Sequence, residues 1–203
     1  MIFGITGGSG CGKTTALQAV QDLGGLILDC DAIYHRLLEE SPALCAAIEA
    51  RFPGVVEQGV LNRKKLGSLV FGDPEALLDL NRIAHGAVKA EVLRLLDAWD
   101  GHAAIDAIAL FEGGLTELCD YTVAVTAPRE ERIARLMARE GITRAYAEAR
   151  LDAQKPEEFF RQACDFTLEN NQSREEFYEK ARKLFEDLLK NTEKMGTLPN
   201  FGK

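Results

Sequence analysis

The sequence lacks the features that mark membrane-spanning, secreted and nucleic-acid-binding proteins. No apolar run approaches the length of a membrane span, and the first residues carry no charged segment of the kind that opens a signal peptide. The formal charge of −8 at pH 7 argues against nucleic acid as the main ligand, because a phosphate backbone requires a basic surface. These absences predict a soluble, cytoplasmic protein with no membrane or nucleic-acid partner.

The sequence also lacks closely spaced cysteines, internal repeats and low-complexity tracts. None of the five cysteines forms a C-x-x-C pair, which indicates reduced thiols rather than a disulfide framework or a zinc site. The Asn-Lys-x-Asp motif that reads guanine is missing too, so a GTPase is disfavoured. With 203 residues, the chain can bury a substantial core as a single domain.

The most specific pattern that is present is a glycine-rich loop. The pattern G-x-x-x-x-G-K-[ST] spans residues 7–14, between an expected strand at 1–6 and an expected helix at 14–23. Lys13 puts a charge on the outer phosphates of a nucleotide, and the Thr14 hydroxyl can ligate Mg²⁺. The positive end of the helix points at the same anion. Four glycines supply turns and close backbone approach: Gly7, Gly8, Gly10 and Gly12. This loop predicts nucleotide binding.

Cys11 lies inside this loop and has two interpretations. An anion-binding loop should favour the thiolate, which would make Cys11 sensitive to oxidation. A small residue tolerated at a variable loop position is the favoured alternative.

Short apolar strands alternate with helical patterns, which predicts an α/β fold with a five-stranded parallel sheet flanked by helices. The expected strands lie at residues 2–6, 26–28, 103–110, 121–125 and 166–168. A helical stretch from about 32 to 99, with breaks at Pro42, Pro53 and Pro74, exceeds what a plain crossover needs and predicts a helical lobe beside the sheet. An amphipathic helix at 174–189 closes the fold.

These segments define one expected domain over residues 1–190. Its core comprises 1–31, 101–128 and 164–190, the helical lobe about 32–100, and a second helical segment about 129–163. The remaining residues, 191–203, have little apolar content and are expected to form a flexible tail.

Two carboxylates follow the expected second strand. Asp29 and Asp31 stand where parallel strands end, and open α/β sheets bind ligands at that edge. If extended geometry persists, both side chains point the same way. A carboxylate there could position an acceptor hydroxyl and take its proton in phosphoryl transfer. Capping of a helix that starts at Ala32 is an equal alternative for Asp31.

A second pair of acids lies in an expected strand at 104–112, with Asp106 inside it and Glu112 at its end. Such acids can hold Mg²⁺ through water in phosphate-loop enzymes. For Glu112, an ion pair or a cap is an equal alternative.

An arginine-rich face is expected on the segment 129–160. Arg132, Arg135 and Arg139 fall at i, i+3 and i+7, on one side of a helix. Charge runs usually form a solvated face with compensating acids. In a nucleotide kinase, however, such a face can close over the transferring phosphate.

Taken in order, these features resemble the dephospho-coenzyme A kinases from Gly4 to about Asn170. The matching residues are the loop from Gly4 to Thr15; Asp29, Asp31 and His35; Asn62, Arg63, Leu66 and Phe71; Leu80, Asn81, Ile83 and His85; Phe111 and Glu112; Ala127 and Pro128; Arg135, Leu136 and Arg139; and Gln154, Asp165 and Asn170. The chain departs from the family pattern at several positions: Gly86 where the family usually has Pro, Ile108-Ala-Leu110 where it has Pro-Leu-Leu, Arg132 where it has Gln, Phe160 where it has Lys, and Cys164 where it has Ala.

The resemblance implies a P-loop kinase with a helical substrate lobe and a helical lid, which transfers phosphate from ATP, with Mg²⁺, to the ribose 3′-hydroxyl of dephospho-CoA. Another small-metabolite kinase and a non-catalytic nucleotide-binding regulator are the alternatives. The catalytic residues implied are Lys13, Asp31 and Arg139. Those implied for ATP are Gly8, Gly10, Cys11, Gly12, Lys13, Thr14, Thr15, Arg135 and Asn170. Those implied for the acceptor are Asp31, Arg63, His85 and Glu112, and Thr14 is implied for magnesium. Asp106 remains a second magnesium candidate from its place in the expected strand. The protein is expected to be a monomer or a weak homo-oligomer.

Overall fold

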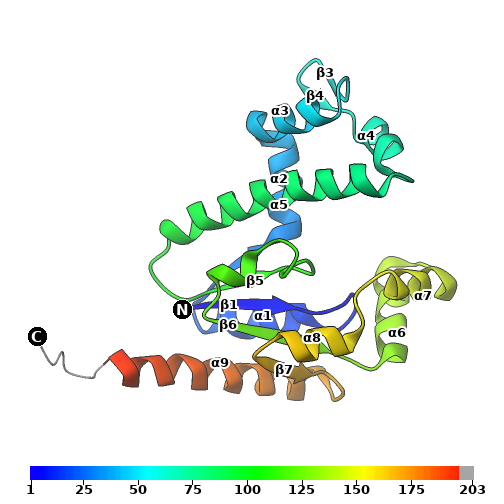
Figure 1. Ribbon diagram of the computed structural model, residues 1–203. Coiled ribbons are helices and arrows are strands. Elements are labelled where there is room, and N and C mark those ends of the chain that lie inside the picture. The colour runs from blue at the N-terminus through cyan, green and yellow to red at the C-terminus, as the bar shows by residue number, and fades with distance from the viewer. Residues whose placement is uncertain (197–203) are drawn as a thin grey trace, which may run out of the picture. The chain divides into compact units, whose positions relative to one another are not determined.

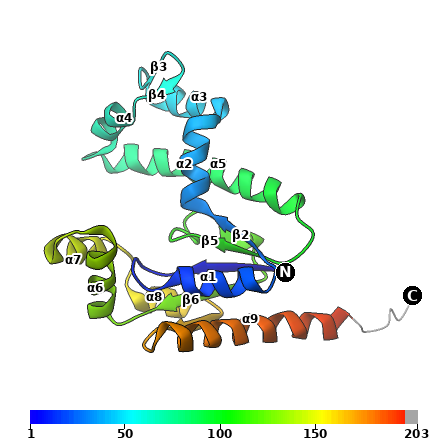
Figure 2. The same cartoon turned by 180° about the vertical axis from the view of Figure 1, so that it is seen from behind.

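The computed structural model describes the backbone of residues 1–196, drawn as a ribbon in Figures 1 and 2, and the side chains of residues 1–190. The described chain divides into two compact units. The first contains Met1–Ile27, Gly101–Ile108 and the chain from Cys119 onward. The second contains Leu28–Asp100 and Ala109–Leu118. The division into core, lobe and lid that the sequence suggests stays a prediction.

The first unit is built on a five-stranded sheet in the order β2-β5-β1-β6-β7, which confirms the expected fold class. The strands are β1 (Ile2–Thr6), β2 (Leu26–Asp29), β5 (Ala103–Asp106), β6 (Tyr121–Thr126) and β7 (Phe166–Glu169). The central strand β1 runs parallel to both β5 and β6, and β6 runs parallel to β7. Strand β2 begins in this unit and continues into the second at Leu28.

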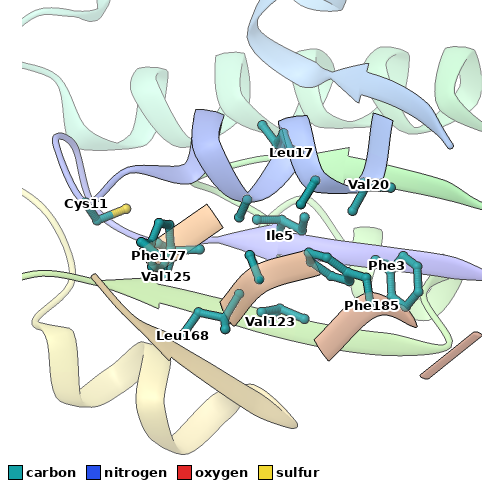
Figure 3. Packing of buried hydrophobic residues seen from close by; sticks show 14 of the residues in the cluster. Phe3, Ile5, Cys11, Leu17, Val20, Val123, Val125, Leu168, Phe177 and Phe185 are labelled. Carbon is teal, nitrogen blue, oxygen red and sulfur yellow. The ribbon is translucent and has the colours of Figure 1, made fainter. Parts of the chain in front are cut away.

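The helices of the first unit are α1 (Lys13–Asp22), α6 (Arg129–Glu140), α7 (Arg144–Asp152), α8 (Glu157–Ala163) and α9 (Arg174–Gly196). Helices α1 and α9 pack together against β1 and β6, and their apolar side chains form the core shown in Figure 3. Phe3 and Phe185 lie side by side there, with ring centroids 5.0 Å apart. This packing holds the end of β1 and the start of α1, and therefore the loop between them, against a rigid base.

Strand β5 ends at Asp106, so the expectation of a strand reaching 110 or Glu112 was wrong. Its neighbour β1 ends at Thr6 and turns into the glycine-rich loop, so the ladder has no partner beyond the pairing of Ile5 with Asp106. The chain then turns, with Gly113 N donating to the Ala109 carbonyl at 2.8 Å. Glu112 consequently lies in a turn rather than at a strand end.

The second unit is mainly helical. Its elements are α2 (Cys30–Glu40), α3 (Pro42–Arg51), β3 (Val56–Glu57), β4 (Val60–Leu61), α4 (Arg63–Val70), α5 (Pro74–Asp97) and the short 3₁₀ helix η1 (Leu115–Leu118). Pro42 and Pro74 each open a helix after a capping residue, Ser41 and Asp73 respectively. The breaks expected at these two prolines are confirmed.

Two features of the structure were not expected from the sequence: a short hairpin in the second unit and a longer final helix. Strands β3 and β4 form an antiparallel hairpin whose turn places Gln58 and Gly59 at positive φ, 53° and 82°, as tight hairpins require. Helix α9 continues to Gly196, although the sequence analysis expected a flexible tail from residue 191. Residues 197–203 of that expected tail lie outside the described residues.

Among the described residues, no helix is long and apolar enough to cross a membrane.

Candidate active site

The glycine-rich loop connects β1 to α1, and its glycines Gly7 and Gly12 lie directly against the neighbouring strands. Gly12 precedes α1 at φ 100°, and a Cβ on it would collide with the amide nitrogen of Asn170. Gly7 has φ 144°, and a Cβ there would collide with the carbonyl oxygen of Val125 on β6. The glycines therefore let the loop lie directly on β6 and beside the end of β7.

The amino-terminal end of α1 is left open. Within the described chain, no side chain caps this helix and its first turn holds no acidic residue. The start of the helix and its dipole are therefore open to an anion, although the Thr15 N–H already donates to the Gly12 carbonyl at 3.0 Å. Thr14 is exposed on this turn, and the Lys13 ammonium donates to the Gly7 carbonyl at 3.1 Å, which keeps the charge at the loop.

Two of the residues expected to bind ATP are brought to this loop from distant parts of the chain. Asn170, which follows β7 and is only 5% exposed, donates its side-chain N–H to the Cys11 carbonyl at 2.9 Å. Arg135 on α6 donates from Nη1 to the Gly10 carbonyl at 3.3 Å.

Arg139 is not brought to the loop. Its side chain is 60% exposed and pairs with the neighbouring Glu140 on the last turn of α6. Of the three arginines on the expected face, the structure therefore directs the first two toward the loop and leaves the third in solvent.

A contact that the sequence did not assign joins Arg132, Gln154 and Ser9. Arg132 Nε donates to the Ser9 carbonyl at 3.0 Å, and Gln154, which follows α7, receives the Ser9 N–H at 2.9 Å. The available signal was the position of Arg132 three residues before Arg135, on the same helix face. No pattern in the sequence connected either residue to Ser9.

Cys11 is buried, at 1% exposure, and belongs to the main core cluster. Burial raises the pKa of its thiol despite the nearby charge of Lys13, which lowers it. The expectation that the loop favours the thiolate was therefore wrong. The favoured alternative, a small side chain that packs in the loop, agrees with this burial.

Asp106 ends β5 beside the loop. It lies opposite Ile5 in the sheet, and its charge is near enough to Cys11 to contribute to the raised pKa of that thiol. The Asp106 carboxylate therefore lies near the glycine-rich loop that precedes α1.

The carboxylates after β2 have separate roles. Helix α2 starts at Cys30, and Asp29 caps it by accepting the Ala32 N–H at 2.9 Å. The capping alternative for Asp31 was therefore wrong, and so was the idea that extended geometry aims both side chains the same way. Asp31 is exposed on the first turn of α2.

The other residues expected on the acceptor side lie, with Asp31, in the second compact unit. Arg63 starts α4 and pairs with Glu39 of α2 at 3.2 Å. His85 is half-buried in the middle of α5, and Glu112 is exposed in the turns after β5. Their roles toward a substrate remain predictions.

A family model and individual relatives of known sequence point to the same family. The family model described as Dephospho-CoA kinase matches residues 1–176. The dephospho-CoA kinase of Mesorhizobium japonicum is 37% identical over 179 residues, which cover 86% of this chain and 90% of the relative. The dephospho-CoA kinase of Anaeromyxobacter dehalogenans is 38% identical over 195 residues and matches over 92% of both chains.

Solved structures agree with this result. TT1252 from Thermus thermophilus superposes with a TM-score of 0.77 at 36% identity, over 94% of this chain and 97% of that one. The dephospho-CoA kinase from Campylobacter jejuni gives a TM-score of 0.67 at 26% identity, over 94% and 98% of the two chains. Shikimate kinase from Acinetobacter baumannii, 17% identical with a TM-score of 0.53 over 94% and 93%, shares the fold. The chain belongs to the dephospho-CoA kinase family.

Proposed function

We propose that this protein is a dephospho-CoA kinase that transfers the γ-phosphoryl group of ATP to the ribose 3′-hydroxyl of dephospho-CoA, giving CoA and ADP. The observation that carries the proposal is the open amino-terminal end of α1 beside Lys13, in a chain of this family. An uncapped helix end under a glycine loop suits a polyphosphate, and family membership identifies the acceptor.

On the donor side, the loop amides and the first turn of α1 bind the phosphates of ATP. Lys13 exchanges its bond to the Gly7 carbonyl for the outer phosphates, where it neutralises charge as the phosphoryl group moves. Asn170 and Arg135 support the loop from its outer side through the carbonyls they contact.

The residues near the loop fit a magnesium ion. The Thr14 hydroxyl and the Asp106 carboxylate are oxygen donors of the kind that Mg²⁺ prefers, and within the described residues no cluster of three or more His, Cys, Asp or Glu forms a complete protein cage. A site with few protein ligands is typical of Mg²⁺ that is shared with substrate phosphates. Bound there, the ion would neutralise charge on the phosphate oxygens.

On the acceptor side, Asp31 orients the 3′-hydroxyl and takes its proton as the new bond to phosphorus forms. Two observations support this role: the side chain is exposed, and the cap of α2 is made by Asp29, so capping does not occupy it. Arg63, His85 and Glu112 bind the remainder of the acceptor. Arg139 exchanges Glu140 for the transferring phosphate when substrates are present.

The test is one coupled assay of the purified protein with ATP, Mg²⁺ and dephospho-CoA, in which ADP and CoA are measured together. Equal amounts of both products support the proposal. A panel of nucleosides, nucleoside monophosphates and other hydroxyl acceptors serves as the control. Faster turnover with one of these would identify another small-metabolite kinase, and ATP binding with no product would identify a non-catalytic regulator. The expected cytoplasmic location and the expected monomer or weak homo-oligomer remain predictions.

A further inference from the structure

The outward carbonyls of the phosphate loop are held by side chains from other segments. When successive N–H groups of a loop turn toward an anion, the carbonyls between them turn away and need donors of their own. The carbonyl of Ser9 receives Arg132 Nε, that of Gly10 receives Arg135 Nη1, and that of Cys11 receives Asn170 Nδ2. Three consecutive carbonyls are therefore fixed on the side away from the phosphate site.

Ser9 is held most completely. Its N–H donates to Gln154 Oε1 at 2.9 Å, and its hydroxyl oxygen accepts from Gln154 Nε2 at 2.7 Å. Arg132 Nε donates to its carbonyl at 3.0 Å, and Arg132 Nη2 donates to the same Gln154 Oε1 at 3.3 Å. The three residues form a closed ring of hydrogen bonds around a residue that is only 5% exposed.

The loop backbone at Gly8 and Gly10 packs directly against Arg132, with no space for a side chain at either glycine. A Cβ on Gly8 would collide with Arg132 Nη2, and a Cβ on Gly10 would lie 2.8 Å from the Arg132 carbonyl oxygen. Helix α6 thus lies against the loop with only glycine between them, and Ser9 stands between these two glycines. A shift of Arg132 or of Gln154 must therefore move the loop backbone, because no side chain is available to absorb it.

We propose that Arg132 and Gln154 are positioning residues that preset the phosphate loop. By fixing Ser9 they hold the carbonyls of Ser9, Gly10 and Cys11 outward, and so preset the backbone of the loop around the phosphate site. Neither side chain touches the phosphates; both act through Ser9. This inference rests on the proposed function, since it concerns the ATP side of the same site.

The experiment measures binding of inorganic tripolyphosphate to the full-length protein by calorimetry, for the wild type, Arg132→Met, Gln154→Met and the double variant. Tripolyphosphate reports the loop alone, because it has no base or ribose. We expect each single variant to bind about tenfold more weakly, since the loop must then be ordered on binding. The double variant should bind about as weakly as either single variant, because each breaks the same ring.

Matched controls remove similar side chains from the same part of the chain. Arg144→Met deletes an arginine of α7 that pairs with Glu130 and Glu148, and Gln162→Met deletes a glutamine of α8 that pairs with Glu158. Both should bind tripolyphosphate like the wild type. Hydrogen exchange of the loop amides in ligand-free protein is the second measurement, and we expect faster exchange in Gln154→Met at unchanged melting temperature. If a Met variant does not fold, Arg132→Gln and Gln154→Glu replace it.

Three results would overturn the inference. The first is wild-type affinity in both single variants. The second is a loss in Arg132→Met alone, which would mean that the arginine acts by charge on the phosphates. The third is a double variant whose loss equals the product of the single losses. Failure of the wild type to bind tripolyphosphate would overturn the proposed function as well, whereas a wild type that turns over normally beside unaffected variants would overturn only this inference.

Discussion

The side-chain amide of Asn170 occupies the space that a Cβ on Gly12 would need. The same amide nitrogen donates to the Cys11 carbonyl at 2.9 Å, so the end of β7 fits directly into the back of the phosphate loop. A residue next to the last strand of the sheet thereby determines which amino acid can stand at the start of α1.

Gly12→Ala should weaken ATP binding more than tenfold, because the new methyl group displaces Asn170 and the residue must hold a φ of 100°. Backbone strain alone costs about 1–3 kcal/mol at such a position. Gly24→Ala is the matched control, since Gly24 has φ 89° but its Cβ would meet no atom within 4 Å. Calorimetric ATP titration and urea unfolding should show similar strain in both variants but lost ATP affinity in Gly12→Ala only. Equal ATP affinity would mean that Asn170 moves aside freely.

Asp31→Asn should lose about 10²–10⁴-fold in turnover, because the amide cannot accept the proton of the acceptor hydroxyl. ATP binding and stability should stay near wild type, since Asp31 is exposed. Asp29→Ala should show the opposite result, a stability loss of about 1 kcal/mol through the lost cap with turnover retained. Steady-state kinetics and urea unfolding of both variants check this. Near-normal turnover of Asp31→Asn would remove Asp31 from the mechanism.

Lys13→Ala should abolish measurable turnover and weaken ATP binding, because its ammonium is the cation that the loop itself holds at the phosphate site. Lys64→Ala, which removes an exposed lysine of α4, is the control and should behave like the wild type. Single-turnover assays with ATP and dephospho-CoA give the comparison. Turnover by Lys13→Ala at more than a few per cent of wild type would contradict the donor-side mechanism.

Substitutions of Arg135 and of Arg139 should change different kinetic parameters. Arg135 already contacts the loop, so Arg135→Met should raise the KM for ATP. Arg139 pairs with Glu140 rather than with the loop, so Arg139→Met should lower kcat with a smaller change in that KM. Initial rates over a range of ATP concentrations test the split. An unchanged kcat in Arg139→Met would leave this arginine as a surface residue.

The second unit should lose stability at acid pH through Glu91. Hydrogen bonds from Arg94 and Arg36 hold the pKa of this carboxylate at about 2, below its ordinary value of 4.5. Because the folded pKa is depressed, its contribution is present above pH 4.5 and is lost as the pH falls toward 2. Glu91→Gln should therefore be less stable than wild type at pH 7, and the difference should shrink across that window.

Urea unfolding between pH 7 and pH 2 measures this difference. Arg94→Met should give the same pH-dependent loss, because Arg94 is the main cause of the depressed pKa. A stability difference that stays constant with pH would show that packing, rather than the ion pairs, is responsible.

The sequence predicted what depends on local pattern. Strand β1 and the loop follow from an apolar run and a glycine motif, so their positions could be read directly. The end of β5 could not, because it depends on where β1 turns away, and no residue of 103–110 records that. The hairpin of β3 and β4 escaped because its strands are only two residues long and Gln58, rather than glycine, takes the first positive φ.

The site shows the same limit. Which of two acids caps α2 depends on a helix start that differs by only two residues, so the sequence offered Asp31 as the cap where the structure has Asp29. Likewise, Arg132 and Arg139 share a helix face, but of these two only Arg132 donates a hydrogen bond to Ser9. Such distinctions arise from three-dimensional contacts between distant segments, which a motif of residue types does not encode.

The hydrogen bond from Asn170 to the Cys11 carbonyl joins two segments that are synthesised far apart in time. The glycine motif is synthesised before β7, and Asn170, which supports its back, lies more than 150 residues further along the chain. A nascent chain that stops short of β7 carries the complete motif without the side chain that holds its carbonyl. We therefore expect a chain truncated before β7 to bind nucleotide more weakly than the full chain.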